Sequence, residues 1–327
     1  MSAGAATGGG SAAAGVIHDI GYQRYEGPRL GRFQIAAALC WHSLRSAFGI
    51  RRGAKAKIVP VLTFVIMCAP AVINAVAMAL SSSHARIVDY DTYTPTLRVI
   101  IMLVFIAAQA PELVARDLRS KVLPLYFARP MRRWDYPAAK YAAFTLACLA
   151  MLDIPVLLLY LGTVFQVHGL SAVLAQTRAL IPGLLVGLMW AVLLAAIGLA
   201  LASVSGRRAF STGAVAIFLF MTWILAHVLT TIASQQSRVG PGGPAGPPRG
   251  AFCAADFQTG TSAAAHLLGI ISPFNVLDGV RQWLGGTNCG IVAKPGQYGA
   301  VYGIALLAFL GASLAGLFFR YARADVA

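Results

Sequence analysis

The chain has 327 residues, of which 58% are hydrophobic and only 11% are charged, and its mean hydropathy is +0.71. Soluble domains carry about 25% charged residues, so this composition excludes an ordinary water-soluble protein. A net charge of +15 would suggest a nucleic-acid partner for a soluble protein, but here the basic residues lie between long apolar segments. We therefore expect an all-α, polytopic fold with the lipid bilayer as its surroundings and no nucleic-acid partner.

The N-terminal region precedes the first apolar segment and divides into two parts. Residues 1–29 are rich in glycine, alanine and serine, which predicts a disordered cytoplasmic segment. No signal peptide is expected, because the first apolar run lies too far from the start. Residues 30–56 have apolar side chains at helical spacing, opposite Arg32, Ser43 and Arg45, and so predict a connecting helix lying along the membrane surface. The apolar side consists of Phe33, Ala36, Ala37, Cys40, Trp41, Leu44 and Phe48.

Six later segments are apolar and long enough to cross a bilayer, and they define a transmembrane domain over residues 57–320. We expect the spans at about 58–80, 96–111, 138–165, 179–204, 210–232 and 298–319. Residues 321–327 form a short tail. Because the number of spans is even, both termini are expected on the same side of the membrane.

Lysine and arginine are distributed unevenly between the two sides of this topology. The N-terminal region, the 110–141 connection, the connection after the fourth span and the C-terminal end carry 19 of the 26 basic residues. The other side carries seven, most of them scattered singly. Since cytoplasmic connections are enriched in lysine and arginine, both termini and the 110–140 loop are predicted to be cytoplasmic.

The 110–140 loop is the most highly charged connection, and its first part is predicted to be helical. Two acid-before-base pairs at i,i+4, Glu112 with Arg116 and Asp117 with Lys121, favour a helix. Three apolar residues, Leu118, Val122 and Leu125, then share one face of it. Proline breaks the regular structure further on, and a new helix leads into the third span.

This loop resembles that of the ABC-2 type permease family, the membrane subunits of one class of ATP-driven exporters. The resemblance rests on an acidic residue, a basic-Pro-x-x-Arg corner and a lysine that opens the next span, here Glu112, Asp117, Arg129, Pro130, Arg133 and Lys140. It implies a coupling helix that docks into a groove on an ATPase subunit. The coupling residues expected from it are Glu112, Arg116, Asp117, Leu118, Arg119, Lys121, Val122, Leu125, Arg129, Pro130 and Arg133. The alternative is a solvated positive loop that binds no partner.

The resemblance also implies the partners and the location of the chain. The sequence contains no GxxxxGK[ST] motif, so a P-loop is absent, and we expect no cofactor and no enzymatic activity in this chain. ATP and Mg would bind to two separate ABC ATPase subunits. A second permease chain, identical or a paralogue, would complete the substrate pathway as a dimer. The expected location is the plasma (inner) membrane of a bacterium.

The outer loop, residues 233–297, begins with a proline- and glycine-rich linker and continues with two short apolar helices within 263–286. Each helix is too short to span a bilayer, so we expect them either to re-enter the outer leaflet or to lie on its surface. Cys253 and Cys289 are the two cysteines on the outer side, where a disulfide between them can persist.

Two alternatives to the exporter remain. Asp153 is a carboxylate inside the third span, which makes it a candidate functional residue of a secondary transporter. It can equally bond to the backbone freed by Pro155. The more remote alternative is an intramembrane enzyme using Ser262, but the later histidine, His266, lies on the same short helix.

The fourth span carries a ridge of small residues at every fourth position, which predicts close helix packing. The ridge consists of Gly183, Gly187, Ala191 and Ala195.

Overall fold

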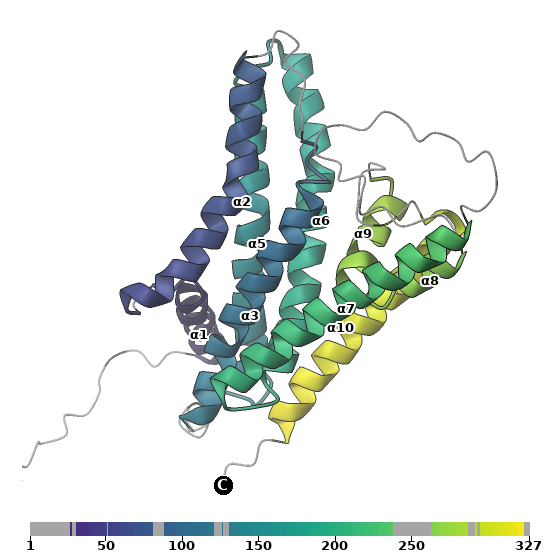
Figure 1. The fold of residues 1–327 in the computed structure, drawn as a ribbon. Coiled ribbons are helices and arrows are strands. Elements are labelled where there is room, and N and C mark those ends of the chain that lie inside the picture. The colour runs from purple at the N-terminus through teal and green to yellow at the C-terminus, as the bar shows by residue number, and fades with distance from the viewer. Residues whose placement is uncertain are drawn as a thin grey trace, which may run out of the picture.

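The structure is a computed structural model that describes residues 27, 31–50, 52–80, 88–120, 126, 131–237, 263–286, 292 and 295–323. Its described residues form helices and no strands (Figure 1). Six helices are long and apolar enough to cross a membrane, which confirms an all-α, multi-pass architecture in this part of the chain. The helices are α1 (Arg32–Ala47), α2 (Ala54–Leu80), α3 (Pro95–Arg119), α5 (Asp135–Val164), α6 (Leu170–Ala202), α7 (Arg208–Ser237), α8 (Ala263–Gly269), α9 (Pro273–Trp283) and α10 (Gly299–Ala322), with a 3-10 turn, η2 (Gly296–Tyr298).

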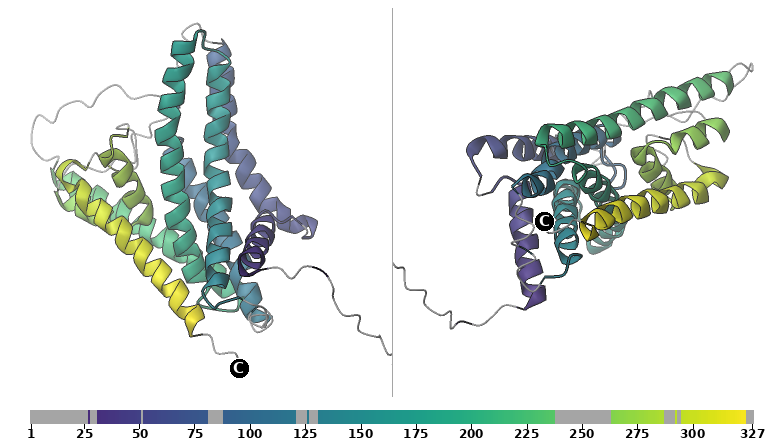
Figure 2. Two further views of the ribbon diagram at one scale, coloured as in Figure 1. Left: turned by 180° about the vertical axis from the view of Figure 1, so that it is seen from behind. Right: turned by 90° about the horizontal axis from the view of Figure 1, so that it is seen from below.

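The spans form an upright group and a slanted pair. Helices α2, α5 and α6 stand side by side, while α7 and α10 slant away from them and hold α8 and α9 between their far ends (Figures 1 and 2). Helix α3 packs against α2, α5, α6 and α7 and is buried over most of its apolar length. By contrast, α7 and α10 leave most of their surface uncovered within the chain. The core therefore lies around α3, and any motion of α3 must involve its neighbours.

The second span is longer than predicted. We expected it to end near Pro111 and a separate helix to follow, but α3 continues unbroken through Pro111 to Arg119. Proline removes one amide donor and usually breaks an isolated helix. A helix packed among neighbours tolerates it, because the surrounding protein stabilises the helix on both sides of the proline. Pro111 and both its neighbours are buried, so packing overrides local propensity here.

The N-terminal helix α1 has two apolar sides. Leu39, Ser43 and Ala47 are buried, and the helix packs against α5 and α3. Phe33 and Trp41, which belong to the predicted apolar side, are 84% and 55% exposed. Large apolar residues of the predicted side are thus divided between the two sides of the helix, since Leu44 and Phe48 pack against the core whereas Phe33 and Trp41 point outward, and the spacing alone does not show this division.

The small-residue ridge of α6 is buried, as predicted, and one of its glycines has a structural reason. A Cβ atom added to Gly187 would lie 1.8 Å from Oδ1 of Asp153 on α5. The α5–α6 contact therefore leaves no room for a Cβ atom at this position unless the Asp153 carboxyl group moves.

We expect Gly187→Ala to lower the free energy of unfolding by about 1 to 3 kcal/mol, the usual range for overpacking. In an Asp153→Ala background the same change should cost much less, because the overlapping carboxylate is gone. Gly311→Ala on α10, where nothing lies within 4 Å, is the matched control and should cause no loss. Denaturant titration of the purified variants measures all four; equal losses in both backgrounds would contradict the contact.

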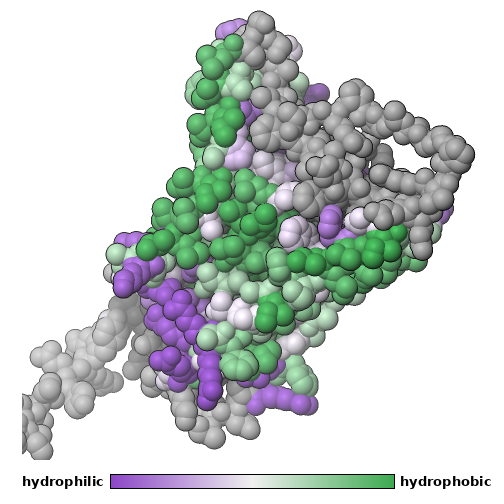
Figure 3. Space-filling model, viewed as in Figure 1, coloured by the Kyte–Doolittle hydropathy of each residue, from purple (hydrophilic) through white to green (hydrophobic). Residues whose placement is uncertain are grey.

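Polar and apolar surfaces are segregated along the molecule. On the face in Figure 3, hydrophilic side chains gather toward the end where α2 begins and α3 ends, below a hydrophobic band.

The topology expected from the charge distribution, with six spans among the described helices, predicts which side of the membrane each connection lies on. Reporter fusions after Arg208 and after Ala327 should report a cytoplasmic location, and a fusion within 241–248 an external one. A cytoplasmic signal from 241–248 would overturn the topology.

Candidate functional site

Charged side chains of α3, α5 and α7 and of Arg52, just before α2, form ion pairs with one another. The helix ends that carry them lie toward the end of the bundle where α10 ends (Figure 1). We call this cluster the charged junction and define it as Arg52, Glu112, Asp117, Lys140 and Arg208. Its two acidic members both lie on α3, in the last two turns of that helix. Its three basic members belong to the beginnings of α2, α5 and α7, so α3 is the common partner of three other spans.

Glu112 forms the more buried half of the junction. Its side chain is 4% exposed and makes ion pairs with Arg52, just before α2, and with Arg208, the first residue of α7. The Arg52 side chain is 17% exposed, whereas that of Arg208 is 65% exposed. A buried carboxylate is stable only when it is paired, so Glu112 fixes α3 to α2 and α7 at this level.

Asp117 forms the other half and binds α5. Its Oδ2 atom lies 2.8 Å from Nζ of Lys140 and accepts a hydrogen bond of 2.8 Å from the hydroxyl of Tyr136. Tyr136 and Lys140 are one helical turn apart, so they present their polar ends to the same carboxylate. Both side chains are buried. The end of α3 is therefore held on the first turns of α5.

Contacts around the junction extend it to α1 and α10. Arg32 of α1 pairs with Asp135 of α5 at 2.5 Å. Arg133 donates a hydrogen bond of 3.2 Å to the carbonyl oxygen of Ala322, the last residue of α10. The segment that joins α3 to α5 is thus connected at its end to the last span.

Part of this junction is predictable from the sequence. The loop pattern points to Glu112, Asp117 and Lys140, but local spacing pairs the two acids with Arg116 and Lys121 on their own helix. In the structure Arg116 is exposed, and the acids pair with residues of other spans. Glu112 takes tertiary partners because its side chain is buried at the packed end of the bundle, where an unpaired charge is costly. Lys121 lies outside the described residues, so its predicted pair with Asp117 stays a prediction.

Two residues of the junction were missed. Arg52 lies in the basic run before the first span and Arg208 opens the fifth span. Their positions at the starts of spans are the available signal, but the sequence interprets both only as charges that determine topology.

The remaining predicted coupling residues fall into two groups. Arg119 and Arg133 are exposed, and Leu118 is partly buried against the core. The other five lie outside the described residues, so the structure does not place them: Lys121, Val122, Leu125, Arg129 and Pro130. The predicted shared face of Leu118, Val122 and Leu125 therefore stays a prediction.

A second polar cluster lies at the opposite end of the bundle, around α9. Arg281 pairs with Asp91 at 2.8 Å and with Asp278 at 2.9 Å, and all three side chains are buried. Gln282 donates a hydrogen bond of 3.0 Å to Asp278. Every residue of α9 from Pro273 to Gln282 is buried, because α9 packs between α6, α7 and α10. Sequence reasoning found the two short helices but not this ion-pair network, which joins α9 to the segment before α3.

Asp153 lies on α5 between these two polar clusters. Its Oδ1 atom is buried without a hydrogen-bond partner among the described residues and lies against Gly187. Arg98 of α3 is close enough to interact with it electrostatically, and the Arg98 guanidinium lies 5.3 Å from the centre of the Trp190 ring. The bond to the backbone that sequence analysis gave as an alternative is not observed for this Oδ1 atom.

The predicted disulfide lies outside the described residues, as do both Cys253 and Cys289. It stays a prediction from their common place in the outer loop. Mass mapping under non-reducing conditions should find them linked, and closing a loop of this length stabilises by about 2 to 4 kcal/mol in the chain-entropy picture. Recovery of both as free thiols would refute it.

His266, named for the enzyme alternative, lies on α8. No group of three or more His, Cys, Asp or Glu side chains in this part of the chain is arranged to hold a metal ion. His266 is buried in α8 and stacks on Tyr298 at a ring distance of 5.3 Å, and its burial lowers its pKa. Ser262 lies outside the described residues. No protein-family model matches the chain, and no curated protein matches it.

Proposed function

We propose that this chain is the permease subunit of an ATP-driven exporter of the ABC-2 type. The observation that supports this most strongly is the charged junction, in which the end of α3 is held by ion pairs to α2, α5 and α7. The 120–134 segment follows α3 directly and leads into α5. A force applied to that segment would therefore act on three spans besides α3 itself. Such a connection suits a chain that is moved by a partner on one face of the membrane.

In this proposal two separate ATPase subunits bind ATP and Mg and dock on the cytoplasmic side, where the basic residues are concentrated. The pathway lies between two permease chains, as identical copies or with a paralogue. Helix α9 and its ion pairs stand at the outer end, where they would close the exit until the spans move. The chain itself carries no catalytic residue in this mechanism.

Purification of a tagged chain from native membranes in mild detergent tests the proposal. A P-loop ATPase should co-purify in stoichiometric amount, and the complex should hydrolyse ATP. Recovery of the intact chain without any ATPase, from cells that express both at native levels, would overturn the proposal. The cargo can then be sought among compounds that stimulate ATP hydrolysis.

A secondary transporter is the second candidate, because one specific observation favours it. The buried Asp153 Oδ1 has no hydrogen-bond partner among the described residues, which leaves this oxygen able to accept a proton, while the nearby Arg98 guanidinium favours the charged carboxylate and so the release of that proton. Transport in vesicles that contain an ion gradient but no ATP would support this candidate. The loss of that transport in Asp153→Asn, and not in Asn74→Ala, would assign it to the carboxylate.

A further inference from the structure

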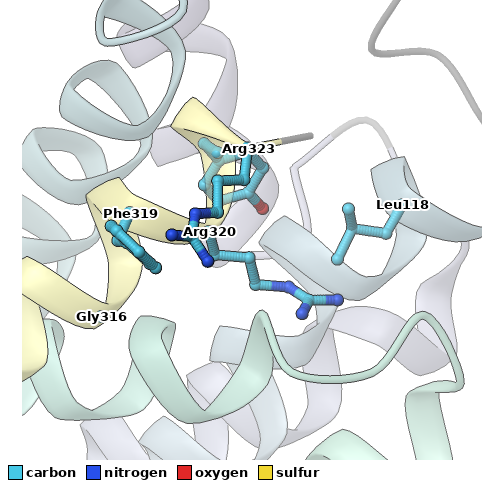
Figure 4. Close-up of a pocket in the computed structure, with 6 residues that line it drawn as sticks. Leu118, Gly316, Phe319, Arg320 and Arg323 are labelled. Carbon is cyan, nitrogen blue, oxygen red and sulfur yellow. The ribbon is translucent and has the colours of Figure 1, made fainter. Parts of the chain in front are cut away.

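A pocket opens at the junction end of the bundle, between α3 and the last turns of α10. Its volume is about 500 Å³, and it is lined by Leu118, Gly316, Phe319, Arg320, Tyr321 and Arg323. Arg320 extends from α10 toward Leu118 on α3, and Arg323 lies beside Phe319 (Figure 4). The pocket thus combines an apolar wall with two guanidinium groups.

The two arginines are available to a ligand. Both are exposed, and neither forms an ion pair with another residue in the described ranges. The guanidinium carbon of Arg323 lies 3.9 Å from the centre of the Phe319 ring, which orients the group without neutralising it. Two guanidinium groups at one pocket favour an anion with several oxygen acceptors, such as a phosphate diester.

The position of the pocket restricts the kind of anion further. Arg320 and Arg323 stand at the end of the membrane-length segment Gly296–Ala322, where lipid headgroups are expected. The same helix exposes large apolar side chains along its length, including Ile304 at 67% and Leu307 at 68%. An acyl chain can lie on this surface while its headgroup occupies the pocket.

We propose that this pocket binds the headgroup of an anionic phospholipid. Basic pockets between spans on the cytoplasmic side are typical sites for such headgroups. An acidic segment of a protein partner would satisfy the arginines equally, but it would make no use of the apolar surface that continues along α10. The proposal goes beyond the exporter function and does not depend on it.

Phosphatidylglycerol binding to the full chain tests this site. In phosphatidylcholine nanodiscs doped with phosphatidylglycerol, native mass spectrometry should show the anionic lipid retained on the wild-type protein. Arg320→Ala/Arg323→Ala should weaken its retention by about tenfold, which corresponds to the loss of one charge-assisted hydrogen bond or more. Arg132→Ala/Arg207→Ala removes two exposed charges near the same end but outside the pocket, and is the matched control.

Further variants and a competing ligand show whether charge, the acyl chains or a protein partner accounts for the retention of the lipid. Arg320→Lys/Arg323→Lys keeps the charge and should retain intermediate binding, and it serves as the test if the alanine variant does not fold. Millimolar inorganic phosphate should not displace the lipid, since it lacks the acyl chains. The proposal fails if the alanine variant retains phosphatidylglycerol, if the control loses as much, or if free phosphate displaces it. It also fails if the alanine variant keeps the lipid and instead releases a co-purifying protein.

Discussion

If the chain is the exporter subunit proposed above, replacing Leu118 and Val122 together by serine is expected to release or uncouple the ATPase while leaving the chain inserted in the membrane. If these side chains dock in an ATPase groove, two side chains of this size contribute about 3 to 6 kcal/mol of transfer free energy. Leu118 is only partly buried within the chain, so part of its apolar surface is available to a partner. The change thus removes binding energy with a smaller effect on the fold.

Arg119→Ala is the matched control for this double change. Arg119 is exposed on the same helix, and an exposed ion pair contributes about 0 to 1 kcal/mol. Co-purification and ATP hydrolysis stimulated by transport should therefore be nearly unchanged in this variant. An intact, fully coupled complex in the serine double variant would mean that the segment is only a positive loop. Unaltered migration in size-exclusion chromatography checks that the variants are folded.

Replacing Glu112 by alanine is expected to lower the free energy of unfolding by about 3 to 5 kcal/mol, the usual cost of breaking a buried ion pair. The change leaves Arg52 and Arg208 near each other without the carboxylate that both of them bind. Most of the loss should come from Arg52, because Arg208 is exposed and can turn into solvent. Denaturant titration of the purified chain gives the value.

A second substitution distinguishes the ion pair from general damage. Glu112→Ala combined with Arg52→Ala should cost much less than the sum of the two single changes, because the second change removes the unpaired charge. Arg116→Ala, on an exposed face of the same helix, should stay within about 0.5 kcal/mol of the wild type. Additive losses from Glu112→Ala and Arg52→Ala would contradict the contact.

These two sets of variants also separate stability from coupling. If the charged junction transmits motion, Glu112→Gln should keep the shape of the side chain, weaken the ion pairs and reduce ATP-driven transport more than ATPase binding. The serine double variant should show the reverse order, with ATPase binding lost first. The comparison identifies which part holds the partner and which part passes its motion to the spans.

The membrane class and the location of the spans could be predicted from the sequence, because apolar length is a local property. All six predicted spans overlap helices of membrane length, and the two short helices predicted within 263–286 are present as α8 and α9. The boundaries were less predictable. The sequence predicts that the second span ends at Pro111, whereas burial among five neighbouring helices carries α3 through to Arg119.

The partners of charged residues could not be predicted in the same way. Local spacing favoured Glu112 with Arg116, yet the structure pairs Glu112 with Arg52, 60 residues away, and with Arg208 on α7. The ion pair between Arg281 and Asp91 joins residues 190 positions apart and has no local signal. A pairing of this kind depends on which helix ends meet, and no window of sequence contains that information.

The sequence by itself determined that this is a helical, multi-pass membrane protein with a highly charged connection after its second span. Hydrophobic length and the clustering of charges are enough for that, since each acts over a few turns of helix. Only the tertiary structure decided that Glu112 and Asp117 hold three other spans to α3, and that Leu118 and Arg320 line one pocket. For the ion pairs the physical reason is burial: packing removes the Glu112 and Lys140 side chains from water, and a buried charge must then take the partner that the fold brings to it.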